Sequence, residues 1–168
     1  LVANMLTVAG IDRVLTMDLH APQIQGFFDV PVDHLYAKPV FKDRFEDFDH
    51  EKTVVVAPDA GGIKMARAYA SMLHMPFAIV VKRRMGPEQV VSEHMIGEVE
   101  GCDVILVDDM ISTAGTITDA SRMVKGHGAR DVYIAATHGL FCGSALERIA
   151  ASDVKSIFVT DTVRPLAH

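Results

Sequence analysis

The chain has 168 residues, of which 49% are hydrophobic, and this is enough to bury a core of its own. Its formal charge of −6 and isoelectric point near 5.7 argue against a general nucleic-acid-binding surface. Two cysteines cannot build a disulfide framework, and no apolar run approaches the roughly 20 residues that a membrane span needs. The composition therefore predicts a globular protein of the reducing cytoplasm that binds neither nucleic acid nor membrane.

The first 52 residues show weak and interrupted patterns. Residues 1–10 carry apolar side chains at helical spacing and stop at Gly10, which favours a short helix. A strand is predicted over residues 13–17, residues 23–28 have the composition of a loop, and residues 30–36 are typical of an extended connection. Residues 42–52 are strongly charged and lack a sustained apolar face, so a domain boundary is expected between residues 41 and 42.

From residue 53 onward, apolar strands and helical stripes alternate regularly. Such an alternation predicts an α/β fold with a parallel sheet. The segment after the second strand, residues 85–97, has no clear period and is expected to be a mobile loop. The predicted strands are residues 54–56, 77–81, 104–107, 132–136 and 156–159, and the predicted helices are residues 63–73, 117–125 and 145–150.

The most informative stretch begins at the strand over residues 104–107. Asp108 and Asp109 are expected to end this strand, and the small, hydroxyl-rich residues 112–116 lead into the helix that starts at Ile117. Free backbone N–H groups at a helix N-terminus favour an anion such as phosphate. Adjacent carboxylates would repel a bare polyphosphate and favour neutral hydroxyls or a metal ion, and a sugar phosphate offers both kinds of group. The alternative is that a hydroxyl merely caps the helix while the aspartates lie in solvent.

Three segments carry a resemblance to known proteins. Residues 107–116 (VDDMISTAGT) resemble the phosphoribosyl pyrophosphate motif of type I phosphoribosyltransferase-fold proteins. Residues 18–28 (DLHAPQIQGFF) and 58–62 (PDAGG) resemble the ribose-phosphate pyrophosphokinases, or phosphoribosyl pyrophosphate synthetases, in order and spacing. The resemblance runs nearly end to end. It implies a Rossmann-like phosphoribosyltransferase domain over residues 42–168, and a remnant of a second similar domain over residues 1–41. The N-terminal part and C-terminal tail of that family are then missing from the chain.

The resemblance also implies an activity and its residues. A ribose-phosphate pyrophosphokinase transfers the diphosphoryl group of ATP to ribose 5-phosphate and requires Mg²⁺. The resemblance also implies a homo-oligomer in which dimers assemble into a hexamer. Asp108 and Asp109 would hold the ribose hydroxyls, and His20 and Asp59 match the family's metal-binding positions. The 5-phosphate would be bound by Ser112, Thr113, Ala114, Gly115 and Thr116. Lys82 and Arg84 match the family's catalytic lysine and arginine.

Each of these residues also has a simpler interpretation. A lone histidine after a strand, as at His20, is usually structural, and Asp59 before Ala-Gly-Gly suits a turn. Residues 82–84 could be a solvated basic strand end, and His138 is expected to be structural. The family usually has aspartate where Ser112 stands, and often has aspartate at the position of Val81.

Two other functions are compatible with the resemblance. A phosphoribosyltransferase consumes the same diphosphate on the same fold, but residues 18–28 and 58–62 argue against it. The regulatory synthetase-associated proteins resemble the synthetases and have a disrupted catalytic loop. The short loop here, together with Lys82 and Arg84, favours the catalytic subunit over that alternative.

Overall fold

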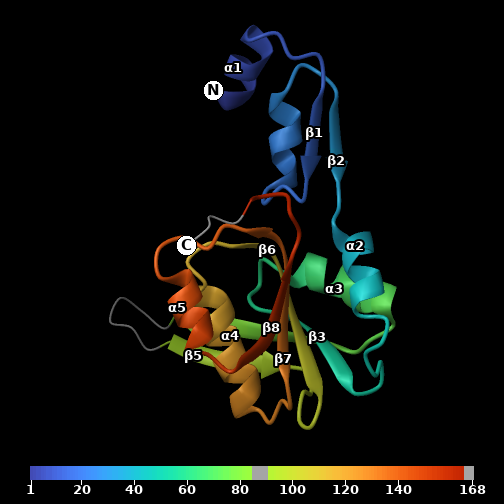
Figure 1. Ribbon diagram of the computed structural model, residues 1–168, viewed down its shortest axis with the longest axis vertical. Helices are drawn as coiled ribbons and strands as arrows, with labels where there is room; N and C mark the ends of the chain where they lie inside the picture. Colours follow the sequence, from blue (N-terminus) through green and yellow to red (C-terminus); the bar gives the residue numbers. More distant parts are fainter. Residues whose placement is uncertain (85–90, 165–168) are drawn as a thin grey trace.

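The computed structural model of the protein (Figure 1) describes residues 1–84 and 91–164. Within these ranges it describes every side chain except those of residues 82–84 and 91–93. Helices and strands alternate along the chain, and this confirms the predicted α/β class. The helices are α1 (Val2–Val8), a 3-10 helix (Pro22–Phe27), α2 (Lys38–Arg44), α3 (Ile63–Leu73), α4 (Gly115–Gly126) and α5 (Ala145–Ala150). The strands are β1 (Val14–Met17), β2 (Val32–Leu35), β3 (Thr53–Ala57), β4 (Phe77–Arg84), β5 (Val91–Ile96), β6 (Asp103–Ile111), β7 (Val132–Gly139) and β8 (Val154–Val159).

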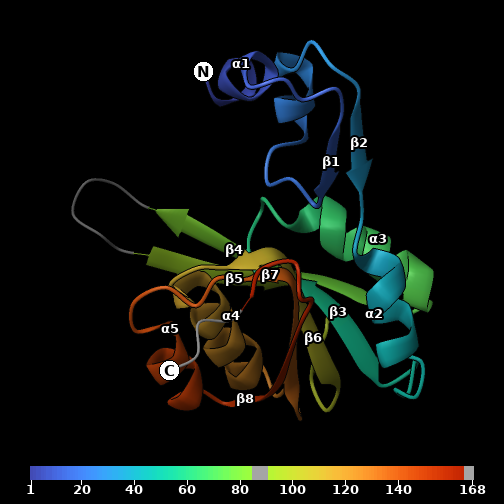
Figure 2. The ribbon, with the colours of Figure 1, turned by 45° about the horizontal axis from the view of Figure 1, so that its top comes forward.

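The described strands form two separate sheets. A large six-stranded sheet has the order β5-β4-β3-β6-β7-β8, in which every pair is parallel except the antiparallel pair β4 and β5. A small sheet consists of β1 and β2, which are parallel to each other. Figures 1 and 2 show the small sheet standing beyond the edge of the large one, with β2 leading into α2.

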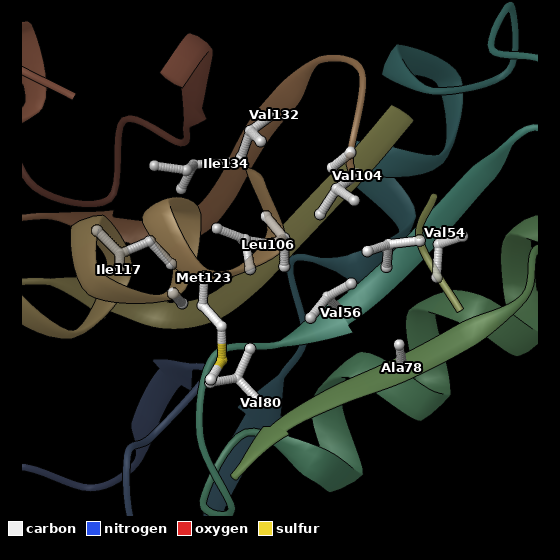
Figure 3. Packing of buried hydrophobic residues seen from close by; sticks show 14 of the residues in the cluster. Val54, Val56, Ala78, Val80, Val104, Leu106, Ile117, Met123, Val132 and Ile134 are labelled. Carbon is white, nitrogen blue, oxygen red and sulfur yellow. The ribbon is translucent and has the colours of Figure 1, made fainter. Parts of the chain in front are cut away.

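Helices cover both faces of the large sheet because its central strands are apolar on both sides. On β3, Val54 and Val56 pack into the cluster that includes α4, as Figure 3 shows, whereas Val55 and Ala57 pack into a second cluster with α2 and α3. All four side chains are at most 2% exposed. The strand is therefore a continuous apolar run, as expected of a parallel strand buried on both faces. Within the described residues, no helix has the length and apolarity to cross a membrane.

Helix α2 runs across the predicted boundary between residues 41 and 42. Phe41 and Phe45, on either side of it, are 3% and 0% exposed and belong to the same apolar cluster as Tyr69 of α3. Phe45 lies within the charged stretch, so this stretch does bury an apolar side chain, and Phe41 adds to the same face from four residues earlier. The division into residues 1–41 and 42–168 stays a prediction, although the helix itself packs with the large sheet.

Two strands, β6 and β5, show where the structure differs from the sequence prediction. Strand β6 continues through Asp108 and Asp109 to Ile111, so the expectation that these carboxylates end the strand was wrong. The reason is that β7 pairs with β6 as far as Ile111, while the pairing with β3 stops at Leu106. Residues 91–96 form β5 rather than part of a loop, because β4 supplies an antiparallel partner. The remaining residues of the predicted mobile loop, 85–90, lie outside the described residues.

Candidate functional site

Three segments that are far apart in the sequence line one open cleft of about 1320 Å³. They are residues 18–23 after β1, residues 59–62 after β3, and residues 108–117 at the end of β6 and the start of α4. The cleft thus contains every residue predicted to bind ribose 5-phosphate or a metal. Lys82 and Arg84 belong to β4, and their side chains lie outside the described ones.

The topology explains why the polar residues gather there. Strands β3 and β6 are adjacent and parallel, so their carboxyl ends lie at the same edge of the sheet, where open α/β sheets bind ligands. Because β6 projects beyond its pairing with β3, Asp108 and Asp109 have one open flank. They are part of a rigid strand and yet border the cleft.

His20 reaches Asp109 across the cleft. The imidazole Nδ1 lies 2.7 Å from Oδ2 of Asp109, although the two residues are 89 positions apart. Hydrogen bonding to Asp109 is the main cause that raises the pKa of His20, and the fields of Asp108 and Asp59 act in the same direction. The small sheet therefore contributes a potential cation to a site whose carboxylates come from the large sheet.

Asp108, the residue before Asp109, titrates unusually. Burial is the main cause that raises its pKa to about 7, and the carboxyl of Asp109 adds to the effect. The backbone N–H of Asp109 donates to Oδ1 of Asp108 at 2.9 Å, which partly offsets the burial. Near neutral pH this carboxyl can therefore exist in both forms, so that it can donate or accept a hydrogen bond.

The loop between β6 and α4 presents a helix N-terminus to the cleft. Ala114 precedes α4 with a left-handed backbone (φ 63°), and no side chain caps the first turn of this helix, which lies wholly in the described part of the chain. The alternative in which Ser112 or Thr113 merely caps the helix is therefore wrong. The first turn begins at Gly115, two residues before the predicted start. Because no side chain caps this turn, its N–H groups remain open to an anion.

Backbone hydrogen bonds hold this loop from behind. The N–H of Cys142 donates to the Ser112 carbonyl at 2.9 Å, and the N–H of Leu140 donates to the Ile111 carbonyl at 3.0 Å. Arg148 of α5 donates through Nη1 to the Thr113 carbonyl at 3.4 Å. The loop is thus supported by the segment after β7 while its other side borders the cleft.

Asp59 makes a turn and also borders the cleft. Its Oδ1 accepts a hydrogen bond from the Gly62 N–H at 3.1 Å, so the turn-forming role considered for it is present. His20 and Asp59 line the same cleft, but the structure brings the His20 ring onto Asp109. Among the described side chains, no three His, Cys, Asp or Glu residues converge as a metal cage.

Sequence reasoning missed the junction between the two sheets. Asp18 is 4% exposed, and its Oδ2 accepts hydrogen bonds from the Ala37 N–H and from Oγ1 of Thr137. His138 was expected to be structural, and its Nε2 lies 3.0 Å from the Met17 carbonyl oxygen. The available signal was that Asp18 follows β1 and that Thr137 and His138 lie at the carboxyl end of β7, but no local pattern could pair them.

Comparison with known proteins assigns the fold and its family. The phosphoribosyl transferase domain family matches residues 36–163. The chain belongs to this family. The match covers β3, β6 and the loop before α4, and so includes the Asp108 and Asp109 side of the cleft.

Relatives within the family are ribose-phosphate pyrophosphokinases. The protein of that name from Rhodopirellula baltica is 54% identical over 166 residues, which are 97% of this chain and 52% of the relative. The one from Chlorobaculum tepidum is 53% identical, over 97% of this chain and 51% of the relative. The chain is therefore a homologue of these enzymes and spans about half their length.

Solved structures agree with this assignment. The crystal structure of phosphoribosylpyrophosphate synthetase from Mycobacterium smegmatis superposes with a TM-score of 0.88 at 41% identity, over 97% of this chain and 53% of the other. An adenine phosphoribosyltransferase from Giardia lamblia superposes with a TM-score of 0.58 at 16% identity, over 72% of this chain and 75% of the other. The second likeness concerns the fold alone.

Proposed function

We propose that the protein acts as a ribose-phosphate diphosphokinase, which transfers the diphosphoryl group of ATP to the anomeric hydroxyl of ribose 5-phosphate. The products are phosphoribosyl pyrophosphate and AMP. The observation that carries the proposal is that both sheets contribute residues to one cleft. An uncapped helix N-terminus, two strand-borne aspartates and a histidine from the small sheet meet there, in a chain about half identical to ribose-phosphate pyrophosphokinases.

The sugar phosphate is assigned to the β6–α4 side of the cleft. The 5-phosphate would lie at residues 112–116, where the open N–H groups and the helix dipole favour an anion. Asp108 and Asp109 would accept hydrogen bonds from the ribose hydroxyls, which an ionised carboxylate can do at close range. The supports behind the loop keep these groups in place before the substrate arrives, and this lowers the entropic cost of reaction.

ATP phosphates are assigned to the side of His20 and Asp59. Magnesium, when bound, would neutralise phosphate charge and orient the transferring group. One carboxylate and one imidazole suit an ion that keeps water and phosphate oxygens as its other ligands. Lys82 and Arg84 would stabilise the charge that develops on the transferring diphosphoryl group.

The remaining assignments follow from the same proposal. We place the protein in the cytoplasm as a homo-oligomer, with residues 1–41 as part of a first domain and residues 42–168 as the second. A phosphoribosyltransferase activity on phosphoribosyl pyrophosphate is the main competitor, because the fold is shared.

The test follows AMP. The protein is incubated with Mg²⁺, ATP and ribose 5-phosphate, and AMP and phosphoribosyl pyrophosphate are quantified together. We expect the two products in equal amounts, and only when ribose 5-phosphate is present. In a separate incubation the protein is given adenine and phosphoribosyl pyrophosphate in place of ATP and ribose 5-phosphate. AMP that forms only in this second incubation would identify a phosphoribosyltransferase. Absence of both reactions would contradict the enzymatic assignment for this chain.

Lys82→Ala distinguishes catalysis from binding. Because Lys82 is assigned to charge that develops only during transfer, its loss should lower turnover on the order of 100-fold while the affinity for ribose 5-phosphate stays the same. Lys64→Ala is the matched control, since Lys64 is a lysine of α3 that lines the cleft and has no assigned role in the transfer. A turnover within about threefold of the parent protein, combined with a raised Michaelis constant, would show that Lys82 only binds.

A further inference from the structure

The two sheets meet at one buried carboxylate that the proposed reaction does not use. Asp18 follows β1 with a left-handed backbone (φ 41°) and is 4% exposed. Its Oδ2 accepts one hydrogen bond from the Ala37 N–H at 2.9 Å and another from Oγ1 of Thr137 at 2.7 Å. The first donor belongs to the start of α2, and the second belongs to β7. One oxygen thus joins the small sheet to the large one.

His138 adds a second tie at the same place. Its Nε2 lies 3.0 Å from the Met17 carbonyl oxygen and 3.2 Å from the Asp18 carbonyl oxygen. Carbonyl oxygens only accept, so Nε2 must carry the hydrogen. Oγ1 of Thr162 lies 2.8 Å from Nδ1 and steadies the other side of the ring. We name Asp18, Ala37, Thr137 and His138 together the Asp18 clasp.

Asp18 of the clasp lies two residues before His20, and hydrogen bonds restrain the backbone between these two residues. The Asp18 N–H donates to the Leu35 carbonyl at 2.9 Å, and the Leu19 N–H donates to Nε2 of His34 at 3.0 Å. The next residue is His20, whose ring meets Asp109 at 2.7 Å. A displacement of Asp18 is therefore passed along this short segment to the contact between His20 and Asp109.

We infer that Thr137 and His138 are positioning residues, which act through Asp18 to hold the end of β1 on β7 and so set His20 against Asp109. The inference rests on the proposed function only where it regards His20 as part of the catalytic cleft. Neither residue of β7 needs to touch the substrate. Their side chains determine how the small sheet, with its half of the cleft, is placed on the large sheet.

Thr137→Val tests this placement. The change removes the hydroxyl donor at a site of 0% exposure and keeps the side-chain shape. In the neutral form of His20, the contact with Asp109 selects the tautomer with hydrogen on Nδ1, because the carboxylate only accepts. Long-range proton–nitrogen NMR should show that Thr137→Val loses this preference. Amide exchange of Ala37 should accelerate by about tenfold or more, while amides in the centre of β6 keep their rates.

Two variants serve as controls. Thr137→Ser keeps the hydroxyl and should restore both readouts. Thr53→Val makes the same chemical change at a buried threonine of the same sheet, whose hydroxyl has no partner among the described residues. It should change neither readout. If Thr137→Val fails to fold, His138→Ala removes the second tie at a half-buried site and is expected to give the same two changes.

The inference is wrong if Thr137→Val leaves the His20 tautomer and the Ala37 exchange unchanged. It is also wrong if exchange accelerates equally throughout β6 and β7, because the hydroxyl would then only stabilise the fold. Both readouts are made without substrate. A failure of ribose 5-phosphate to react would therefore contradict the proposed function and leave the placement of His20 intact.

Discussion

Asp108 has the most unusual charge behaviour among the residues assigned to the sugar. Its pKa rises to about 7, mainly because it is buried, whereas an unfolded chain ionises this carboxyl near 3.8. Between these two values the folded state holds a proton that the unfolded state has lost. The contribution of Asp108 to stability therefore falls as pH rises from about 4 to about 7 and is constant above that range.

Asp108→Asn should remove this pH dependence. We expect the variant to gain stability relative to the parent protein at pH 7.5, and to gain much less at pH 4.5, where the parent carboxyl is neutral in the folded state. Urea denaturation of both proteins at the two pH values measures the difference. An equal difference at pH 4.5 and pH 7.5 would mean that Asp108 titrates normally.

Thr53 illustrates a buried polar atom without compensation. Its side chain is 0% exposed, and Oγ1 has no hydrogen-bond partner among the described residues. Thr53→Val keeps the shape and replaces the hydroxyl, so it should raise the free energy of unfolding by about 1 kcal/mol. Denaturant unfolding checks this, with Thr137→Val as the contrast, since that hydroxyl donates to Asp18 and its loss should destabilise.

At the scale of elements, the end of the sheet opposite the cleft is joined by an ion pair. Arg130, just before β7, donates to Asp103 of β6 through Nε at 2.8 Å and Nη2 at 2.6 Å. The bond to Arg130 holds the pKa of Asp103 below its usual range. The stabilisation is therefore present above the ordinary pKa of aspartate and is lost as pH falls through the lowered one.

Arg130→Ala should destabilise the protein modestly, because it breaks the two hydrogen bonds to Asp103, although Arg130 itself is 53% exposed and the pair is screened by water. Arg130→Lys should recover only part of this loss, since lysine cannot form the paired contact. Thermal unfolding at pH 7 measures both variants. Ribose 5-phosphate affinity should stay unchanged, and a weaker affinity would contradict the separation between the two ends of the sheet.

Individual elements differ in how well the sequence predicted them. The helical stripe over residues 63–73 gave the bounds of α3, and the apolar run over residues 54–56 gave β3 within one residue at each end. Both depend on local periodicity. β5 was missed because its pairing with β4 is decided by the neighbouring strand. The length of β6 was missed because β7 supports its charged residues.

At the scale of the whole molecule, the candidate site could be predicted as a set of residues but not as a geometry. The order of polar residues after strands indicated His20, Asp59 and the 108–116 segment, and all of them line the cleft. The contact of His20 with Asp109 and the bond of Asp18 to Thr137 span 89 and 119 residues. No local pattern specifies such pairs, since they depend on how two sheets are placed on each other.

The central claim is that the cleft binds ribose 5-phosphate, and a binding measurement tests it most directly. Isothermal titration calorimetry should show one ribose 5-phosphate per chain, with inorganic phosphate and ribose each bound more weakly. Thr113→Val combined with Thr116→Val should weaken binding by about tenfold or more, because both residues line the phosphate side of the cleft. Thr160→Val, whose hydroxyl bonds the Thr137 carbonyl outside the cleft, should bind like the parent protein. Equal affinity of all three proteins, or no binding at millimolar ribose 5-phosphate, would contradict the account.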